Sequence, residues 1–106
     1  MNLKKISLLI EEVIIIIRRP NTILIYCEWK SISEAVDHLN RLLKKLESPL
    51  EYQKAICELT TLFAPTGTIQ DISFDNGWGD KYLEIAIKFG ELVESIQLGK
   101  LHPNRF

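Results

Sequence analysis

The chain has 106 residues, an ordinary size for one domain, so we expect residues 1–106 to form a single domain. Hydrophobic residues make up 46% of the chain and charged residues 25%, which excludes an intrinsically disordered protein. The net charge of −1 gives no general attraction to nucleic acid or to an anionic membrane, and we expect neither as a partner.

Residues 2–19 repeat aliphatic side chains at helical spacing, and this pattern predicts a helix. The predicted inward face is Leu3, Ile6, Ile10, Val13 and Ile17, flanked by Leu9, Ile14 and Ile16. Leu8 and Ile15 form a second apolar stripe on the polar side, where a partner could dock. The aliphatic run at 13–17 is too short to cross a bilayer, and acids precede it, so we expect no signal peptide or membrane anchor.

A second interpretation stays open for residues 13–28. The run from Val13 to Ile17 is β-branched, and residues 22–27 also resemble a strand, so the two could form a hairpin. An α+β fold with an N-terminal hairpin is therefore the alternative to an all-α fold. Extended residues at 22–28 would need a partner for their backbone groups.

The next two helices have clear start signals. Ser31-Ile32-Ser33-Glu34 matches the capping box, and apolar side chains then recur at helical spacing as far as Leu46. Ser48 and Pro49 end this helix and begin another, with Ser48 as the cap and Pro49 in the first turn. The second helix ends near Gly67. The short link predicts that the two helices are antiparallel neighbours.

The rest of the chain predicts a turn and a last helix. Residues 64–80 have no long period, and we predict a turn at Asp75-Asn76-Gly77 with a short strand or helical turn at 69–74. The last helix is predicted from about Gly79 to Gln97, capped by Gly99 and supported by a pair between Glu84 and Lys88. The predicted fold is therefore a small all-α bundle of about four helices.

No cluster of residues meets the needs of catalysis, and we predict that the protein is not an enzyme. A catalytic histidine needs a positioned nucleophile or carboxylate, and Asp37, which is adjacent to His38 in sequence, points elsewhere on a helix. The acids around Asn76 do not follow the spacing of a calcium loop, so we expect neither a metal nor another cofactor. Cys27 and Cys57 lie far from ligand-spaced histidines, which is typical of buried, reduced thiols in the cytoplasm. Trp78, between two glycines, is an aromatic anchor for either the core or a partner.

Acidic residues gather between positions 71 and 94. The segment contains six acids and only two basic residues, Lys81 and Lys88, which gives it a net charge of −4. The acids are Asp71, Asp75, Asp80, Glu84, Glu91 and Glu94. A solvated helix face explains them without a partner, and an acidic contact surface is the alternative.

The segment Phe63–Phe89, FAPTGTIQDISFDNGWGDKYLEIAIKF, is about a quarter of the chain. It resembles small, functionally uncharacterised bacterial proteins that carry a Phe-x-Pro-Thr-Gly…Asp-Asn-Gly-Trp-Gly block after several amphipathic helices. These proteins are similar to cytosolic immunity proteins of polymorphic or contact-dependent growth-inhibition toxin systems. The resemblance implies a cytoplasmic protein that binds a cognate toxin and occludes its active site.

Many such toxins are nucleases with basic clefts, and an acidic surface would complement them. The contact residues that follow from this resemblance and from the local charge are Asp71, Asp75, Trp78, Asp80, Glu84 and Glu91. The alternative is a helical interaction or regulatory subunit, or a homo-oligomer, that uses the stripe of Leu8 and Ile15.

Overall fold

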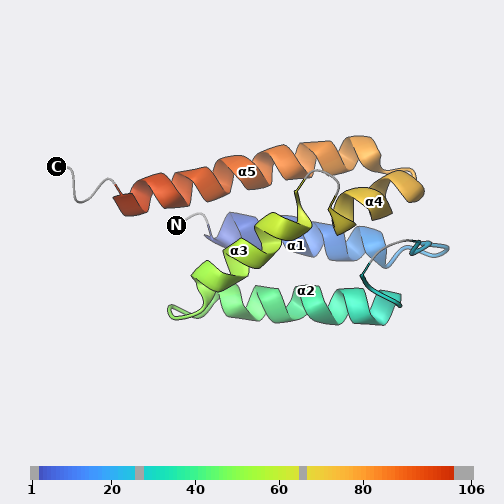
Figure 1. Cartoon of the computed structure of the whole chain (residues 1–106), viewed down its shortest axis with the longest axis horizontal. Coiled ribbons are helices and arrows are strands. Elements are labelled where there is room, and N and C mark those ends of the chain that lie inside the picture. Colours follow the sequence, from blue (N-terminus) through green and yellow to red (C-terminus); the bar gives the residue numbers. More distant parts are fainter. Residues whose placement is uncertain (1–2, 26–27, 65–66, 102–106) are drawn as a thin grey trace.

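The computed structural model describes residues 3–25, 28–64 and 67–101, with side chains described as far as residue 96. These residues form helices and no strand (Figure 1). The helices are α1 (Leu3–Ile17), α2 (Ile32–Leu46), α3 (Tyr52–Leu62), α4 (Thr68–Asp75) and α5 (Gly79–Leu101). The predicted all-α fold is confirmed, with five helices in the described residues where about four were expected.

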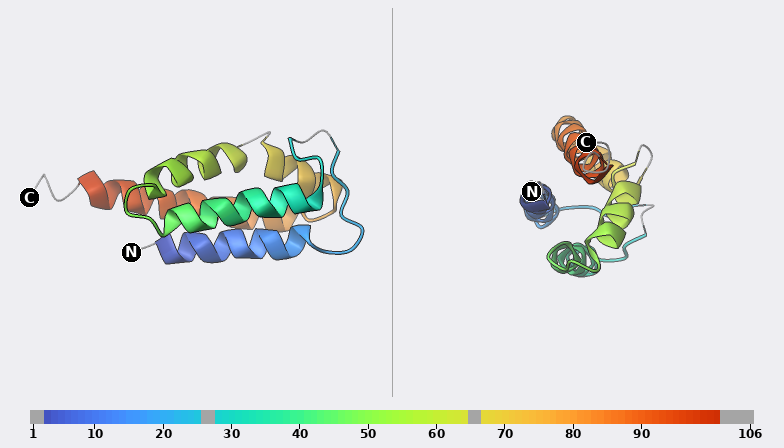
Figure 2. Two further views of the ribbon diagram at one scale, coloured as in Figure 1. Left: turned by 90° about the horizontal axis from the view of Figure 1, so that it is seen from below. Right: turned by 90° about the vertical axis from the view of Figure 1, so that its left-hand side faces the viewer.

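The hairpin alternative at 13–28 is wrong, because α1 continues without a break through Ile17. β-branched residues have weak helix propensity, but burial outweighs it here. Nearly half of α1 is buried, since the helix lies between α2 and α5 (Figure 2). Its buried residues are Ile6, Leu9, Ile10, Val13, Ile14, Ile16 and Ile17. A helix covered on two sides needs a wide apolar face, which the aliphatic run supplies.

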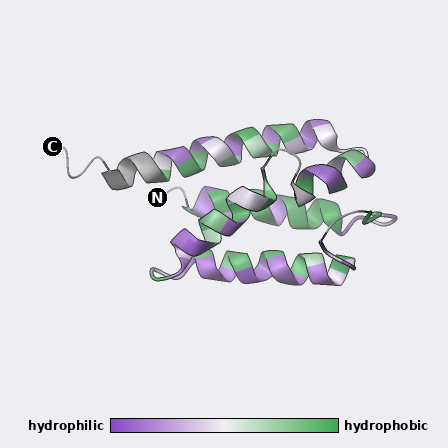
Figure 3. Cartoon of the chain, viewed as in Figure 1, coloured by the Kyte–Doolittle hydropathy of each residue, from purple (hydrophilic) through white to green (hydrophobic). Residues whose placement is uncertain are grey.

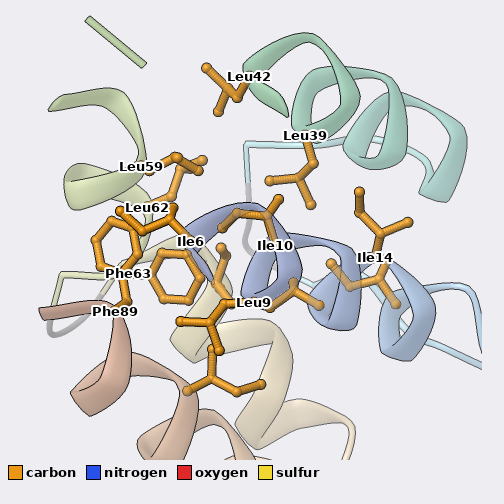
Figure 4. Packing of buried hydrophobic residues seen from close by; sticks show 14 of the residues in the cluster. Ile6, Leu9, Ile10, Ile14, Leu39, Leu42, Leu59, Leu62, Phe63 and Phe89 are labelled. Atoms are coloured by element: carbon orange, nitrogen blue, oxygen red, sulfur yellow. The ribbon is translucent and has the colours of Figure 1, made fainter. Parts of the chain in front are cut away.

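The helices meet around one hydrophobic core. Figure 3 shows the long hydrophobic surface of α1, and Figure 4 shows Ile6 and Ile10 pointing among side chains of α2 and α3. Phe63 stacks on Phe89 of α5 with ring centroids 4.6 Å apart. The buried Tyr82 hydroxyl donates a hydrogen bond of 2.8 Å to the Phe63 carbonyl. These contacts join the end of α3 to α5.

The antiparallel helix pair of α2 and α3 follows the predicted start signals, except that α3 begins later than predicted. The Ser31 hydroxyl accepts from the Glu34 amide at 3.1 Å, as the capping box predicts. The Glu34 carboxylate accepts from the Lys30 amide, one residue outside the cap. Helix α3 begins at Tyr52, later than predicted, because the chain first makes a turn in which the Tyr52 amide donates to the Ser48 carbonyl.

Asn76 supplies the backbone partner that the extended connector needs. The connector residues Thr22–Ile25 are neither helical nor paired in a sheet. The Ile23 amide donates to Asn76 Oδ1 at 2.7 Å, and Asn76 Nδ2 donates to the Ile23 carbonyl at 2.7 Å. One amide side chain therefore replaces a neighbouring strand and ties the connector to the end of α4.

Two boundaries near the C-terminus differ from prediction. The segment expected to be a short strand or helical turn is the eight-residue helix α4. Helix α5 continues past Gly99, so the predicted cap at that glycine is wrong. Glycine only weakens a helix by about 1 kcal/mol and does not by itself end one.

Candidate partner-binding surface

The junction between α4 and α5 positions the predicted contact residues. The Trp78 amide donates to the Ser73 carbonyl at 2.8 Å, and the Gly77 amide donates to the Phe74 carbonyl. Gly77 has a φ of +80°, so the junction is a Schellman motif with glycine at its left-handed position. The Asp-Asn-Gly-Trp-Gly block therefore has a local structural explanation: it ends α4, holds the connector through Asn76 and begins α5.

Trp78 belongs to the core. Its side chain is only 7% exposed, which matches the core interpretation of this anchor and removes it from the accessible surface. The ring of Phe74 packs over the next residue, Gly79, where a Cβ would lie 2.4 Å from Phe74 Cδ1. Phe74 itself is 54% exposed, so the junction presents a phenylalanine to solvent instead of the tryptophan.

The outward face of α5 carries most of the predicted acids. Asp80, Glu84 and Glu91 are exposed, and at 1.5 Å per residue they extend over about 16 Å of helix. Glu94 is also exposed on α5. Leu83 and Ile87, which are 48% and 64% exposed, lie among these acids. Neither Leu83 nor Ile87 is among the contact residues expected from the sequence, although their positions outside the inward apolar stripe of the helix were a usable signal.

The two acids of α4 lie beside this face in the chain but differ in setting. Asp71 is half-buried in the first turn, where its charge favours the positive end of the helix dipole. Asp75 is exposed in the last turn, where a negative charge is unfavourable for the dipole. Asp75 has no ion pair with any residue that the structure describes. The stability of α4 therefore does not explain why an aspartate is present at position 75.

Lys81 neutralises part of the acidic face. Its ammonium lies 2.9 Å from Glu12 of α1 and 3.7 Å from Glu84. The hydrogen bond and charge of Glu12, followed by the charge of Glu84, raise the pKa of Lys81 above 10.5. Glu84 thus pairs with Lys81, and not with Lys88 as predicted. Asp80 and Glu91 are exposed and form no ion pair with any residue that the structure describes.

A hollow of about 470 Å³ lies between α3 and α5, beside the acidic face. Phe63, Phe89 and Val93 border it with large apolar side chains, and Ala64, Ala86 and Gly90 border it with small ones. Glu94 places a carboxylate at the same hollow. The hollow is a shallow depression that is broadly open to solvent.

The second apolar stripe lies on α1. Leu8 and Ile15 are 52% and 68% exposed, as the helical pattern predicted. A smaller hollow of about 390 Å³ joins Leu8 to Leu92 of α5 and is bordered by Lys5 and Lys88. Glu91 also borders this hollow, so the surface carries both signs of charge and meets the edge of the acidic face of α5.

His38 is engaged in a side-chain relay. The Trp29 indole N–H donates to His38 Nδ1 at 3.0 Å, and His38 Nε2 lies 2.6 Å from the Glu58 carboxylate. Because Nδ1 accepts, the proton of a neutral ring is on Nε2 and is donated to Glu58. Both ring nitrogens therefore have partners, and the relay ties the connector to α2 and α3. The α2–α3 hairpin held a signal for this pair, since positions 38 and 58 are equally distant from Ser48.

Other chemical features of the described residues are few. Cys57 is exposed, so the expectation of a buried thiol is wrong there, and Cys27 lies outside the described residues. Within the described ranges, no three histidine, cysteine or acidic side chains are placed to hold a metal ion. Among the helices that the structure describes, none combines the length and apolar character that crossing a bilayer requires.

Comparison with known proteins adds no relative. No protein family, no curated protein and no solved structure matches this chain.

Proposed function

We propose that this protein is a cytoplasmic immunity protein that binds a cognate bacterial toxin and covers its active site. The observation that carries the proposal is the outward face of α5, where exposed acids surround Leu83 and Ile87. Protein interfaces concentrate their binding energy in a few central residues within a ring that excludes water. Apolar side chains among exposed carboxylates provide such a centre and a charged rim.

The size of this face suits a protein partner. The acids from Asp80 to Glu91 span about 16 Å, and Asp75 and Phe74 extend the exposed surface into the preceding junction. A standard interface buries about 800 Å² on each partner, so the whole face fits within one contact. A nuclease toxin with a basic substrate cleft would match its charge. The carboxylates would then speed encounter and reject partners with the wrong charge.

A growth assay tests this proposal. The protein is co-expressed with the toxic domain encoded by the neighbouring gene, and surviving colonies are counted. The test variant carries D75K, D80K, E84K and E91K, which changes the net charge from −1 to +7 (−1 + 8). We expect protection to be lost and association with the purified toxin to slow by about 100-fold at low salt.

A matched control separates local from global charge. The control carries E11K in α1, D37K in α2, and E47K and E51K in the link between α2 and α3, four exposed acids whose replacement gives the same final charge of +7. It should still protect cells. Equal protection by both variants, each folded by circular dichroism, would overturn the assignment of the α5 face, and absence of protection by the native protein would overturn the function.

A second candidate is a helical interaction or regulatory subunit that uses Leu8 and Ile15 of α1. The exposure of these two side chains favours it. Mass measurement in solution distinguishes the candidates, because a stable homo-oligomer that is lost in the L8A/I15A variant supports this alternative.

A further inference from the structure

Gly90 is the one glycine in the interior of α5 whose surroundings the structure describes. Contacts within the chain do not explain why this residue is glycine. Glycine in a helix interior loses more backbone freedom on folding than alanine does. A Cβ at position 90 would have no heavy atom within 4 Å, outside the helix's own backbone. At Gly67, by contrast, a Cβ would lie 2.8 Å from the Ala64 carbonyl oxygen. Packing therefore requires glycine at position 67. At position 90, glycine weakens α5, and no contact within the chain prevents a larger residue there.

Open space at Gly90 belongs to the hollow between α3 and α5. On α5, Ala86 is one turn before Gly90, and Leu83 and Ile87 lie three residues before Ala86 and Gly90 respectively. Residues three or four apart on a helix are surface neighbours. Two residues that border the hollow, Ala86 and Gly90, are therefore helix neighbours of the exposed apolar residues Leu83 and Ile87.

We propose that this hollow receives an apolar anchor side chain from a cationic protein partner. The inference depends on the proposed function, since it names the part of the partner that the α5 face would bind. Phe63 and Phe89 are only 6% and 3% exposed, so their rings form the buried apolar floor of the hollow. The absence of a side chain at Gly90 lets the partner approach this floor closely.

Charge decides between a cationic partner and a second copy of this chain. Glu94 borders the hollow, and Glu91 follows Gly90 directly on the exposed side of α5. Two copies that met through this face would bring the same carboxylates together, and like charges that face each other are unfavourable. Lysine or arginine residues beside the anchor of a partner would instead meet these carboxylates.

The first experiment uses a synthetic helical peptide of lysine and leucine with one central phenylalanine. Full-length ¹⁵N-labelled protein is titrated with it and followed by amide chemical shifts. We expect saturable shifts centred on Ala64, Ala86 and Gly90. A second peptide of equal charge, with alanine in place of the phenylalanine, should bind about tenfold more weakly. Shifts centred elsewhere, no binding, or equal affinity for the two peptides would overturn the proposal.

Filling the hollow provides the matched variants. G90L places a leucine in the open space and should weaken binding of the phenylalanine peptide by about tenfold. N40L adds a leucine at an exposed position of α2 and should change the affinity by less than about twofold. Leucine favours helix more than either glycine or asparagine, so both variants should fold. Equal affinity of G90L and the native protein would contradict the anchor site.

The toxin assay separates failure of this inference from failure of the proposed function. If the native protein and G90L protect cells equally, the anchor site is wrong and the immunity function stands. If the peptide results hold but the native protein gives no protection, the site stands and the immunity function is wrong.

Discussion

Replacing Gly90 by alanine is expected to stabilise the protein, which is unusual for a single substitution. The added methyl group meets no heavy atom within 4 Å, so it creates no strain inside the chain. Alanine reduces the conformational freedom of the unfolded chain and favours the helix, which together give about 0.5–1 kcal/mol. For a domain of this size, that free energy raises the midpoint of thermal unfolding by about 2–6 °C.

Urea unfolding followed by circular dichroism at 222 nm measures this effect. We expect a higher midpoint with an unchanged dependence on urea concentration, since the area exposed on unfolding stays the same. Two other glycines give controls of opposite sign. G77A forces alanine into the left-handed region at φ +80° and should cost about 1 kcal/mol. G67A places a Cβ 2.8 Å from a carbonyl oxygen and should also destabilise. A lower midpoint for G90A would refute the reading of position 90 as open space.

The remaining predictions concern two hydrogen-bonded side chains. N76A removes both bonds to Ile23 and should lower the free energy of unfolding by about 1–3 kcal/mol, with faster hydrogen exchange at the Ile23 amide as its specific signature. N76A with native exchange at Ile23 would show that the connector is held by other contacts. Y82F removes the buried bond to the Phe63 carbonyl and should cost about 1–2 kcal/mol in the same urea assay; no change would mean that the carbonyl finds water. Burial raises the pKa of Tyr82 above 10.0, so the folded state holds this proton more tightly than the unfolded chain. Its contribution is therefore complete below pH 10 and lost as the pH rises through the folded pKa, and the alkaline loss of stability should be smaller in Y82F.

Local sequence signals were sufficient for most of the helices. The capping box at Ser31 involves residues within three positions of each other, and the helical period of Ile6, Ile10 and Val13 identifies the buried side of α1. Boundaries were less secure where signals conflicted. Ser48 has the sequence of a helix cap but forms a separate turn before α3, and the glycine at 99 lies within α5.

The candidate surface was only partly predictable. The acids Asp80, Glu84 and Glu91 are exposed, but Trp78 is buried, since an aromatic ring between two glycines suits a core and a partner equally well by sequence. Leu83 and Ile87 could have been identified from the helical period alone. The hollow at Gly90 could not, because its floor combines Phe63 with Phe89, twenty-six positions further along the chain.

The sequence by itself predicted most of the helical segments and the inward apolar side of each, because helix period, caps and turn residues act within a few positions. It left the helix at 68–75 undecided between a strand and a helical turn, and it left a hairpin open at 13–28. The tertiary structure decided which distant residues form hydrogen bonds and contacts with one another. Asn76 holds Ile23 across fifty-three residues, and His38 lies between Trp29 and Glu58. The outward face of α5 likewise gains its hollow only because α3 ends beside it. Such contacts depend on the packing of helices against each other, and no local pattern encodes their geometry.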